Sequence, residues 1–284
     1  MPSTPSWHRV GHRLTVAFNQ LRRLLNSPVA SNSQTPFPKS RNVVLDIVAE
    51  GRRKNIVHCF FEVDASALRA QISNCTPQSG KRISITSYIS GILAASVAAD
   101  PRMHAYRHKG RELILFDDVD LSVMVERNVD GRRQPLPFIV RAANRKTFLE
   151  VDEALKQAKS APLFAEGPLS ALEAQFFSLP RILRKIVWAF ARNDAHLFRQ
   201  IAGTVGVTSL VRYSTGRMFG LPITPMSLTL TIGEISPHLA LVDGVLIEGK
   251  SLQLTLSADH DVIDGVPLAR FMHKLKVNLE QGMS

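Results

Sequence analysis

The chain has 284 residues, of which 45% are apolar, and a formal net charge of +11 at pH 7. This composition supports a substantial core, and no apolar run approaches the about 20 residues of a membrane-spanning helix, so we expect a soluble or peripheral protein. Two cysteines without a CxxC pair predict neither a disulfide framework nor a metal site, and the few aromatic residues, with no recognition motif, predict no nucleic-acid partner.

Residues 1–40 differ in composition from the rest of the chain. No acidic residue precedes Asp46, and apolar residues recur at helical spacing. These are Trp7, Val10, Leu14, Phe18, Leu21 and Leu25. We predict a basic amphipathic helix and a Ser/Pro/Asn linker, which could lie on an anionic membrane surface, act as a transit peptide or pack on the domain. The expected location is the cytoplasm, or the mitochondrial matrix in a eukaryote.

Residues 41–284 are predicted to form one domain of mixed α and β structure. Apolar periodicity predicts helices over Ser84–Ala99 and Glu150–Lys159. Residue alternation predicts strands over Val57–Val63, Leu113–Val125 (one or two), Gly203–Leu210, Leu228–Ile235, Leu239–Ile247 and Leu252–Ala258. Strands and helices in this irregular order indicate a two-layer α/β sandwich.

A second basic amphipathic helix is predicted within residues 160–202, over Leu179–Phe190. Its apolar residues share one face, with Arg181, Arg184 and Lys185 beside it. These apolar residues are Ile182, Leu183, Ile186, Val187 and Phe190. We interpret the segment as an added helix that covers a hydrophobic surface of the domain. The alternative is a lid, or part of an apolar acyl or membrane site.

The sequence around His260 indicates a catalytic site. An alternating strand leads into Asp259-His-Asp-Val-Ile-Asp-Gly265, and an amphipathic helical pattern follows. A histidine at such a corner is held by rigid elements on both sides and is a candidate general base. A His-x-x-x-Asp-Gly string arises by chance in roughly 2% of shuffled chains, so the motif is weak without its context.

The segment Leu254–Phe271 resembles the C-terminal signature of the dihydrolipoyl acyltransferase cores of 2-oxo acid dehydrogenase complexes, and more distantly that of chloramphenicol acetyltransferases. Thr229–Ile235 resembles the strand before the last hairpin of this family, and Val242-Asp-Gly244 its turn. Ile83–Asp100 and Pro137–Thr147 resemble two further family segments. The resemblance implies a chloramphenicol acetyltransferase-like α/β sandwich, with a mixed sheet and helices on one face, that assembles as a homotrimer.

The same resemblance implies a mechanism and site residues. His260 would be the general base toward the thiol of coenzyme A, and Thr208, in Gly203-Thr-Val-Gly-Val-Thr-Ser-Leu210, would stabilise the oxyanion. Ser209 is the second choice for that hydroxyl. Asp264 would hold the loop and a neighbouring arginine. The substrate would be acyl-CoA or another acyl thioester, with no cofactor-binding residues identifiable from the sequence.

Several features depart from the family pattern. Asp261 stands where the family carries arginine, Arg127–Pro137 exceeds the family's turn, and residues 160–202 replace a short loop. No lipoyl domain is evident in the chain, so we expect no lipoyl group on it and a stand-alone CoA-dependent acyltransferase. The alternatives are an acyltransferase to a hydroxyl or amine acceptor, and a non-catalytic trimeric scaffold.

Overall fold

The computed structural model describes residues 37, 41–75, 81–129, 132–160, 179–211, 216–242 and 244–283. Apart from Phe37, they belong to one compact unit, residues 39–284. The predicted N-terminal helix and, apart from Phe37, its linker fall outside the described residues. Within those residues, no helix combines the length and apolar character needed to cross a membrane.

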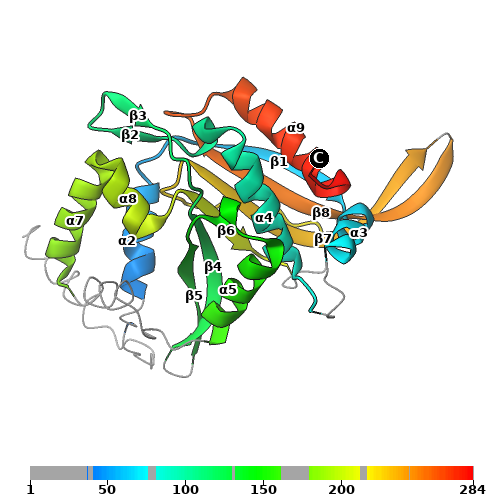
Figure 1. Ribbon diagram of the computed structural model, residues 1–284, viewed down its shortest axis with the longest axis horizontal. Helices are drawn as coiled ribbons and strands as arrows, with labels where there is room; N and C mark the ends of the chain where they lie inside the picture. The colour runs from blue at the N-terminus through cyan, green and yellow to red at the C-terminus, as the bar shows by residue number, and fades with distance from the viewer. Residues whose placement is uncertain are drawn as a thin grey trace, which may run out of the picture. The chain divides into compact units, whose positions relative to one another are not determined.

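A six-stranded mixed sheet lies at the centre of this unit (Figure 1), in the order β1-β8-β7-β6-β4-β5. Strand β6 pairs in parallel with β4 and β7, whereas the other pairs are antiparallel. The strands are β1 (Ile56–Asp64), β4 (Leu121–Val129), β5 (Arg132–Val140), β6 (Val205–Ser209), β7 (Leu228–Val242) and β8 (Val245–Asp259). Strands β2 (Tyr106–His108) and β3 (Glu112–Ile114) form a separate hairpin.

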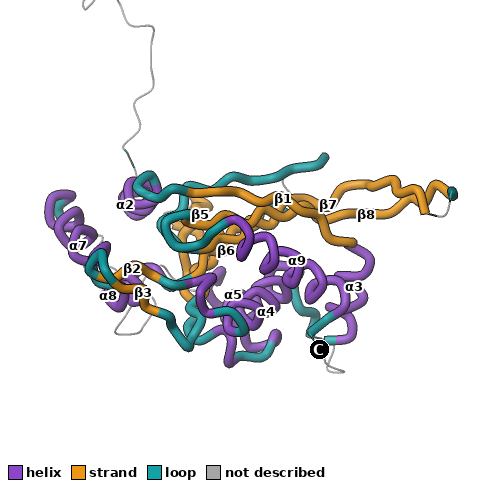
Figure 2. The backbone as a smooth tube through the Cα atoms, turned by 90° about the horizontal axis from the view of Figure 1, so that it is seen from above, coloured by secondary structure: helices purple, strands orange, loops and turns teal. Residues whose placement is uncertain are grey.

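Four helices cover one face of the sheet in both views (Figures 1 and 2). They are α3 (Ala65–Asn74), α4 (Ile85–Ala98), α5 (Phe148–Ser160) and α9 (Gly265–Gln281). Ser84 begins α4, because its side chain accepts a hydrogen bond from the Ser87 amide. Apolar residues of these helices and of the strands form one buried core. The predicted two-layer sandwich with helices on one face is therefore confirmed.

The other face of the sheet is polar and is covered by residues 216–227. Alternation along β8 turns Leu252, Leu254 and Leu256 toward the helices and the buried Gln253 and Thr255 to the opposite side. The covering segment runs so close that a Cβ at Gly233 would collide with the Met218 carbonyl oxygen, and one at Gly220 would lie 2.7 Å from Thr231. The Phe60 and Phe219 rings, 5.3 Å apart, meet edge to face there.

The prediction of one strand over Leu239–Ile247 was wrong. These residues form the far ends of β7 and β8 and the turn between them, where Gly244 has a φ of +82°. The hairpin extends beyond α3 (Figure 1). Its tip exposes five apolar side chains, those of Leu239, Leu241, Val245, Leu246 and Ile247. The reversal agrees with the turn that the family resemblance implied at Val242-Asp-Gly244, whereas the apolar residues on both sides led the residue pattern to one strand.

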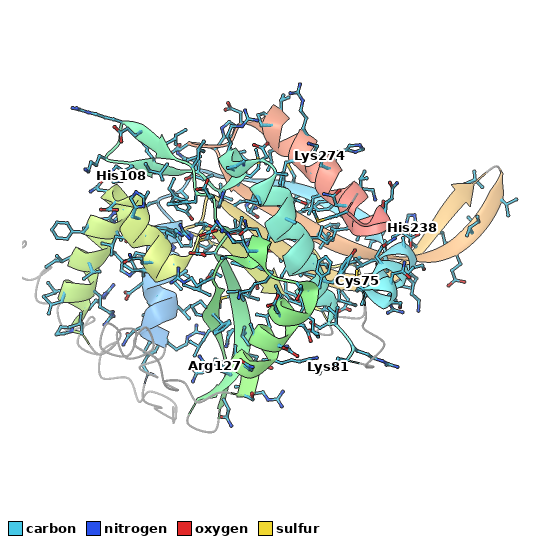
Figure 3. All side chains as sticks on the ribbon, in the orientation of Figure 1. Cys75, Lys81, His108, Arg127, His238 and Lys274 are labelled. Atoms are coloured by element: carbon cyan, nitrogen blue, oxygen red, sulfur yellow. The ribbon has the colours of Figure 1, made fainter. Side chains whose placement is uncertain are left out.

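Helices α2 (Arg41–Gly51), α7 (Arg181–Asn193) and α8 (Ala195–Ala202) form a second packed group with the β2–β3 hairpin. Trp188 of α7 meets Phe198 of α8, with ring centroids 6.1 Å apart. His108 of β2 accepts a hydrogen bond from the Ala195 amide at 3.2 Å (Figure 3). Two 3₁₀ turns, η1 (Pro101–His104) and η2 (Ala143–Arg145), complete the described elements.

The helix predicted within residues 160–202 is present as α7, and it covers a hydrophobic surface of the domain through Trp188, but not with the apolar face that periodicity identified. Ile182 and Phe190 are 73% and 68% exposed. The inward face instead carries the buried Arg184, whose guanidinium pairs with Asp46 of α2 at 2.6 Å. Periodicity identified the apolar face of the helix, but the carboxylate of α2 decided which face turns inward.

Candidate active site

His260 lies at the corner between β8 and α9. Its backbone N–H donates to the Asn55 carbonyl oxygen at 2.8 Å, and the Asp259 N–H donates to the Ser227 carbonyl oxygen at 2.9 Å. These two bonds join the corner to the chain before β1 and to the start of β7. The imidazole itself is 48% exposed. The backbone is thus fixed while the side chain remains accessible to a substrate.

Asp259 fixes the loop around His260. Its buried carboxylate accepts from the Lys54 ammonium at 2.7 Å and from the Asp261 N–H at 3.2 Å. The Asp259 carbonyl oxygen accepts from the amides of Val262 and Ile263. Sequence reasoning did not assign a role to Asp259, although it lies beside the motif.

Asn55 adds a further bond, since its side-chain amide donates to the Asp261 carboxylate at 2.9 Å. Lys54 and Asn55 were also not recognised as site residues. They lie 205 or more positions before their partners, so no local pattern could have identified them.

Asp264 takes a more exposed position than Asp259. One oxygen of its carboxylate lies 3.9 Å from Nδ1 of His260, which is too long for a hydrogen bond. The side chain is 84% exposed and makes no capping bond to α9, although Asp264 is the N-cap residue. In this chain the loop is held by Asp259, and the expected role of Asp264 stays a prediction.

Thr208 and Ser209 are directed to opposite faces of the sheet. Val205 and Val207 belong to the core beneath the helices, so alternation along β6 turns Thr208 to the other face. The Ser209 hydroxyl accepts from Thr86 of α4 at 3.2 Å, which places Ser209 on the helix side. The two candidate hydroxyls therefore cannot serve the same substrate position.

One chain does not bring Thr208 and His260 together. Thr208 is in register with Thr231 of β7, which is in register with Thr255 of β8. His260 follows Thr255 by five positions, or about 17 Å along the strand, and two strand spacings add about 10 Å across the sheet. A site that uses both residues needs a second copy of the chain.

A cavity of about 370 Å³ adjoins the His260 loop. It lies between the end of α2, the β2–β3 hairpin, the α7–α8 corner, Pro225 and Asp261. The cations that line it are Arg53, Lys54, Arg107 and Arg192. Lys54 and Arg192 pair with Asp259 and Glu50, whereas the Arg107 guanidinium donates to the Gly110 carbonyl oxygen. The cavity therefore offers positive charge beside an apolar wall that includes Phe198.

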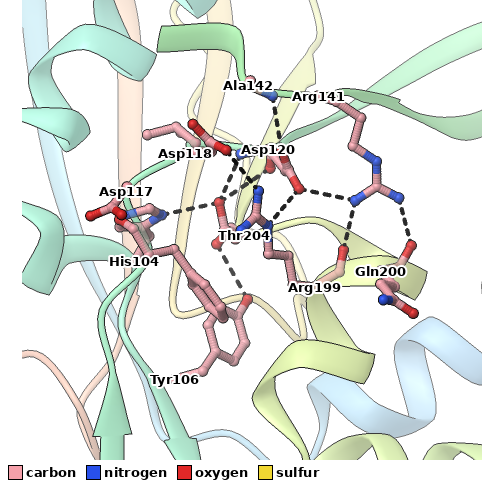
Figure 4. Close-up of polar contacts among 12 residues, drawn as sticks. His104, Tyr106, Asp117, Asp118, Asp120, Arg141, Ala142, Arg199, Gln200 and Thr204 are labelled. Atoms are coloured by element: carbon pink, nitrogen blue, oxygen red, sulfur yellow. Dashed lines mark hydrogen bonds and ion pairs between the residues drawn. The ribbon is translucent and has the colours of Figure 1, made fainter. Parts of the chain in front are cut away.

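A buried ionic network positions the start of β6 (Figure 4). The Asp120 carboxylate accepts from Arg141, Arg199 and the Ala142 amide, at 2.8 to 3.0 Å. Burial raises the pKa of Asp120, but these hydrogen bonds together outweigh burial and hold the pKa below its usual value. Arg141 also donates to the carbonyl oxygens of Arg199 and Gln200, which lie in the last turn of α8. The Asp120 carbonyl oxygen also accepts from the N–H of Val205, the first residue of β6, at 3.2 Å, so the network links α8 to the strand that carries Thr208.

Residues 201–284 match the family model described as 2-oxoacid dehydrogenases acyltransferase (catalytic domain). The comparison with curated proteins gives no match. The matched segment contains Thr208, His260 and Asp264, the three residues proposed from the sequence.

Solved structures extend the likeness over most of the chain. A probable dihydrolipoamide acetyltransferase of Listeria monocytogenes is 16% identical, with a TM-score of 0.66 over 90% of this chain and 97% of that one. The dihydrolipoamide acetyltransferase of Azotobacter vinelandii is 17% identical, with a TM-score of 0.65 over 90% and 94%. The cubic core of a pyruvate dehydrogenase multienzyme complex is 17% identical, with a TM-score of 0.63 over 90% of this chain and 94% of that one.

The chain thus combines, in residues 201–284, the sequence pattern of the acyltransferase catalytic domain of 2-oxoacid dehydrogenases with the fold of dihydrolipoamide acetyltransferase cores.

Proposed function

We propose that this protein transfers an acyl group between a coenzyme A thioester and a thiol acceptor. The observation that carries the proposal is the half-exposed His260 on a corner fixed by Asp259, within the segment that matches the acyltransferase family. The A. vinelandii structure was determined to examine a serine, a histidine and an asparagine in that enzyme's mechanism. Thr208, His260 and Asp264 would be the counterparts in this chain.

The proposed reaction begins with proton transfer from the acceptor thiol to the neutral His260 imidazole. A thiol with an ordinary pKa of about 8.5 is mostly protonated at pH 7, so a base near the sulfur raises the fraction of thiolate. The thiolate attacks the thioester carbonyl carbon, and the Thr208 hydroxyl donates to the oxygen that gains negative charge. The intermediate then expels the donor thiolate, which receives the proton from His260.

The separation of Thr208 and His260 leads us to propose that the site forms between subunits of a homotrimer. Neither residue can reach the other in one chain, although Thr208 is only partly buried and the His260 imidazole is half-exposed. The exposed apolar tip of the β7–β8 hairpin offers a surface for contact between copies. One matched structure is a cubic core, so chains of this fold form larger assemblies.

The cationic cavity beside the His260 loop is the proposed site for anionic groups of the substrate, such as the phosphates of coenzyme A. Arg107 is exposed and donates to a carbonyl oxygen rather than to a carboxylate, so its guanidinium can bind an anion. Arg107→Gln is expected to raise KM with little change in kcat. Arg111→Gln, on the same hairpin but outside the cavity, is the matched control.

The test of the function is transfer from a panel of acyl-CoAs to free dihydrolipoamide, with hydroxyl and amine acceptors in parallel. Wild-type protein is expected to transfer to the thiol, and His260→Ala to lose roughly 10²–10⁴-fold in rate. Preference for a hydroxyl or an amine would replace the thiol assignment. A folded wild type that is inactive with every acceptor would identify a scaffold, and an active His260→Ala variant would overturn the proposed base.

A further inference from the structure

Helix α7 presents its apolar face away from the protein. Its four large outward side chains are those of Ile182, Leu183, Ile186 and Phe190, which are 73%, 46%, 46% and 68% exposed. They recur at helical spacing and therefore form one stripe along the helix. A contiguous apolar patch of this kind on a protein surface marks an interaction site, since scattered single residues would not align in this way.

The orientation of α7 is fixed by strong contacts on the opposite side. The Arg184 guanidinium is buried against Asp46 and also donates to the Leu179 carbonyl oxygen. Arg192 pairs with Glu50 at 3.1 Å, and Trp188 is buried against α8. Turning the apolar stripe inward would break both ion pairs and expose the tryptophan. The outward stripe is thus a stable feature of the fold.

The charges around the stripe are positive. Arg181 and Lys185 are exposed beside it, and the sequence Arg181–Asn193 contains no acidic residue. The two carboxylates of α2 that face α7 are already paired with Arg184 and Arg192. Among the described residues, no carboxylate pairs with Arg181 or Lys185, and apolar side chains flanked by such cations are the pattern of helices that lie in the interface of an anionic lipid bilayer.

We propose that α7 binds the surface of an anionic lipid membrane, with its apolar stripe among the acyl chains and with Arg181 and Lys185 at the headgroups. A second copy of the chain is the competing occupant of this face, and light scattering distinguishes it from a membrane. The inference does not depend on the acyl-transfer activity.

The test is co-sedimentation of the full-length protein with phosphatidylcholine vesicles, with and without phosphatidylglycerol. Wild type is expected to bind the anionic vesicles and to release with added salt, since exposed charges are screened over about 10 Å at 0.1 M salt. Ile182→Ser/Phe190→Ser is expected to weaken binding about tenfold or more. Leu221→Ser/Ile223→Ser, which replaces two apolar residues exposed elsewhere, should bind like wild type.

The contribution of charge is tested with Arg181→Gln/Lys185→Gln, which removes both cations beside the stripe. This variant should bind anionic vesicles several-fold more weakly and should keep the weak binding to phosphatidylcholine vesicles. A variant that lacks residues 1–30 distinguishes binding by α7 from binding by the basic N-terminal segment. The proposal is overturned if the deletion abolishes binding while the α7 variants bind normally. It is equally overturned if no vesicle binds wild type, or if light scattering shows that the Ser variants dissociate an assembly without affecting lipid binding.

Discussion

The imidazole of His260 owes its position to residues that are not themselves expected to react. Asp259 is buried and holds both Lys54 and the turn after His260, so the corner has little freedom to move. Thr208 is held by backbone pairing instead: its strand β6 pairs in parallel with β7, which pairs antiparallel with β8. Rigid placement of this kind is what a general base and an oxyanion donor require, because both act only at the correct distance from the reacting atoms.

Replacement of Thr208 tests the oxyanion donor. Thr208→Ala is expected to lower kcat by about 10²–10³-fold, because one hydrogen bond to the developing oxyanion is lost. Thr208→Ser keeps the hydroxyl and should be mild. Ser209→Ala should also be mild, since that hydroxyl is turned toward α4. Steady-state acyl transfer measures all three, and a larger loss for Ser209→Ala than for Thr208→Ala would reverse the assignment.

His104 predicts a specific dependence of stability on pH. Burial lowers the pKa of its side chain from 6.5 to about 4, partly offset by the hydrogen bond to the Phe116 carbonyl oxygen. The unfolded chain therefore takes up a proton near pH 6.5 that the folded protein does not bind until about pH 4. Folding stability is full above pH 6.5 and falls by roughly 3 kcal/mol as the pH decreases to about 4.

Denaturant titrations between pH 4 and 7 measure this effect, and His104→Gln is the control. Glutamine does not titrate, so the difference in unfolding free energy between wild type and variant should shrink as the pH falls. A constant difference across this range would show that His104 binds its proton at the same pH in the folded and the unfolded chain.

At the scale of elements, α7 depends on an ion pair in a buried position. Arg184→Met would leave the Asp46 carboxylate buried without its partner, at a cost of about 3–5 kcal/mol in the free energy of unfolding. Arg184→Met/Asp46→Leu should recover most of that loss, because no uncompensated charge remains. Arg181→Met, at an exposed position of the same helix, serves as the control. Equal stability of all variants in denaturant would mean that the pair does not hold α7.

The whole molecule is the scale at which the proposed site is complete. His260→Ala and Thr208→Ala subunits should each form inactive or weakly active assemblies. Mixed trimers made by co-expression should regain up to about a third of the wild-type activity, because a trimer with two subunits of one kind and one of the other unites an intact histidine with an intact threonine at about one interface in three.

Two affinity tags isolate the mixed trimers, and light scattering establishes their size. Mixed assemblies that remain inactive would exclude a site shared between subunits. A purified wild type that is only monomeric would remove the shared site altogether.

Much of this arrangement was predictable from the sequence. Alternation and helical spacing revealed most of the sheet, the helices α4, α5 and α7 and the corner that carries His260, because these patterns reflect local backbone geometry. The same alternation assigns Thr208 and Ser209 to different faces once one face is known to be buried. Helices α2, α3 and α8 were not predicted: α2 and α3 have weak apolar periodicity, and α8 is amphipathic but has only 8 residues.

Only the tertiary structure decided which partner each face meets. Periodicity shows that residues share a side of a helix, but it does not show that a carboxylate on α2 draws Arg184 inward and leaves Phe190 outside. Likewise, Lys54 and Asp259 are 205 positions apart, and only the pairing of β1 with β8 brings them to 2.7 Å. Local sequence fixes the elements and their faces because those depend on neighbouring residues. The contact of Lys54 with Asp259 and the outward orientation of the apolar face of α7 depend on segments that are distant in sequence, and only the topology of the fold brings these segments together.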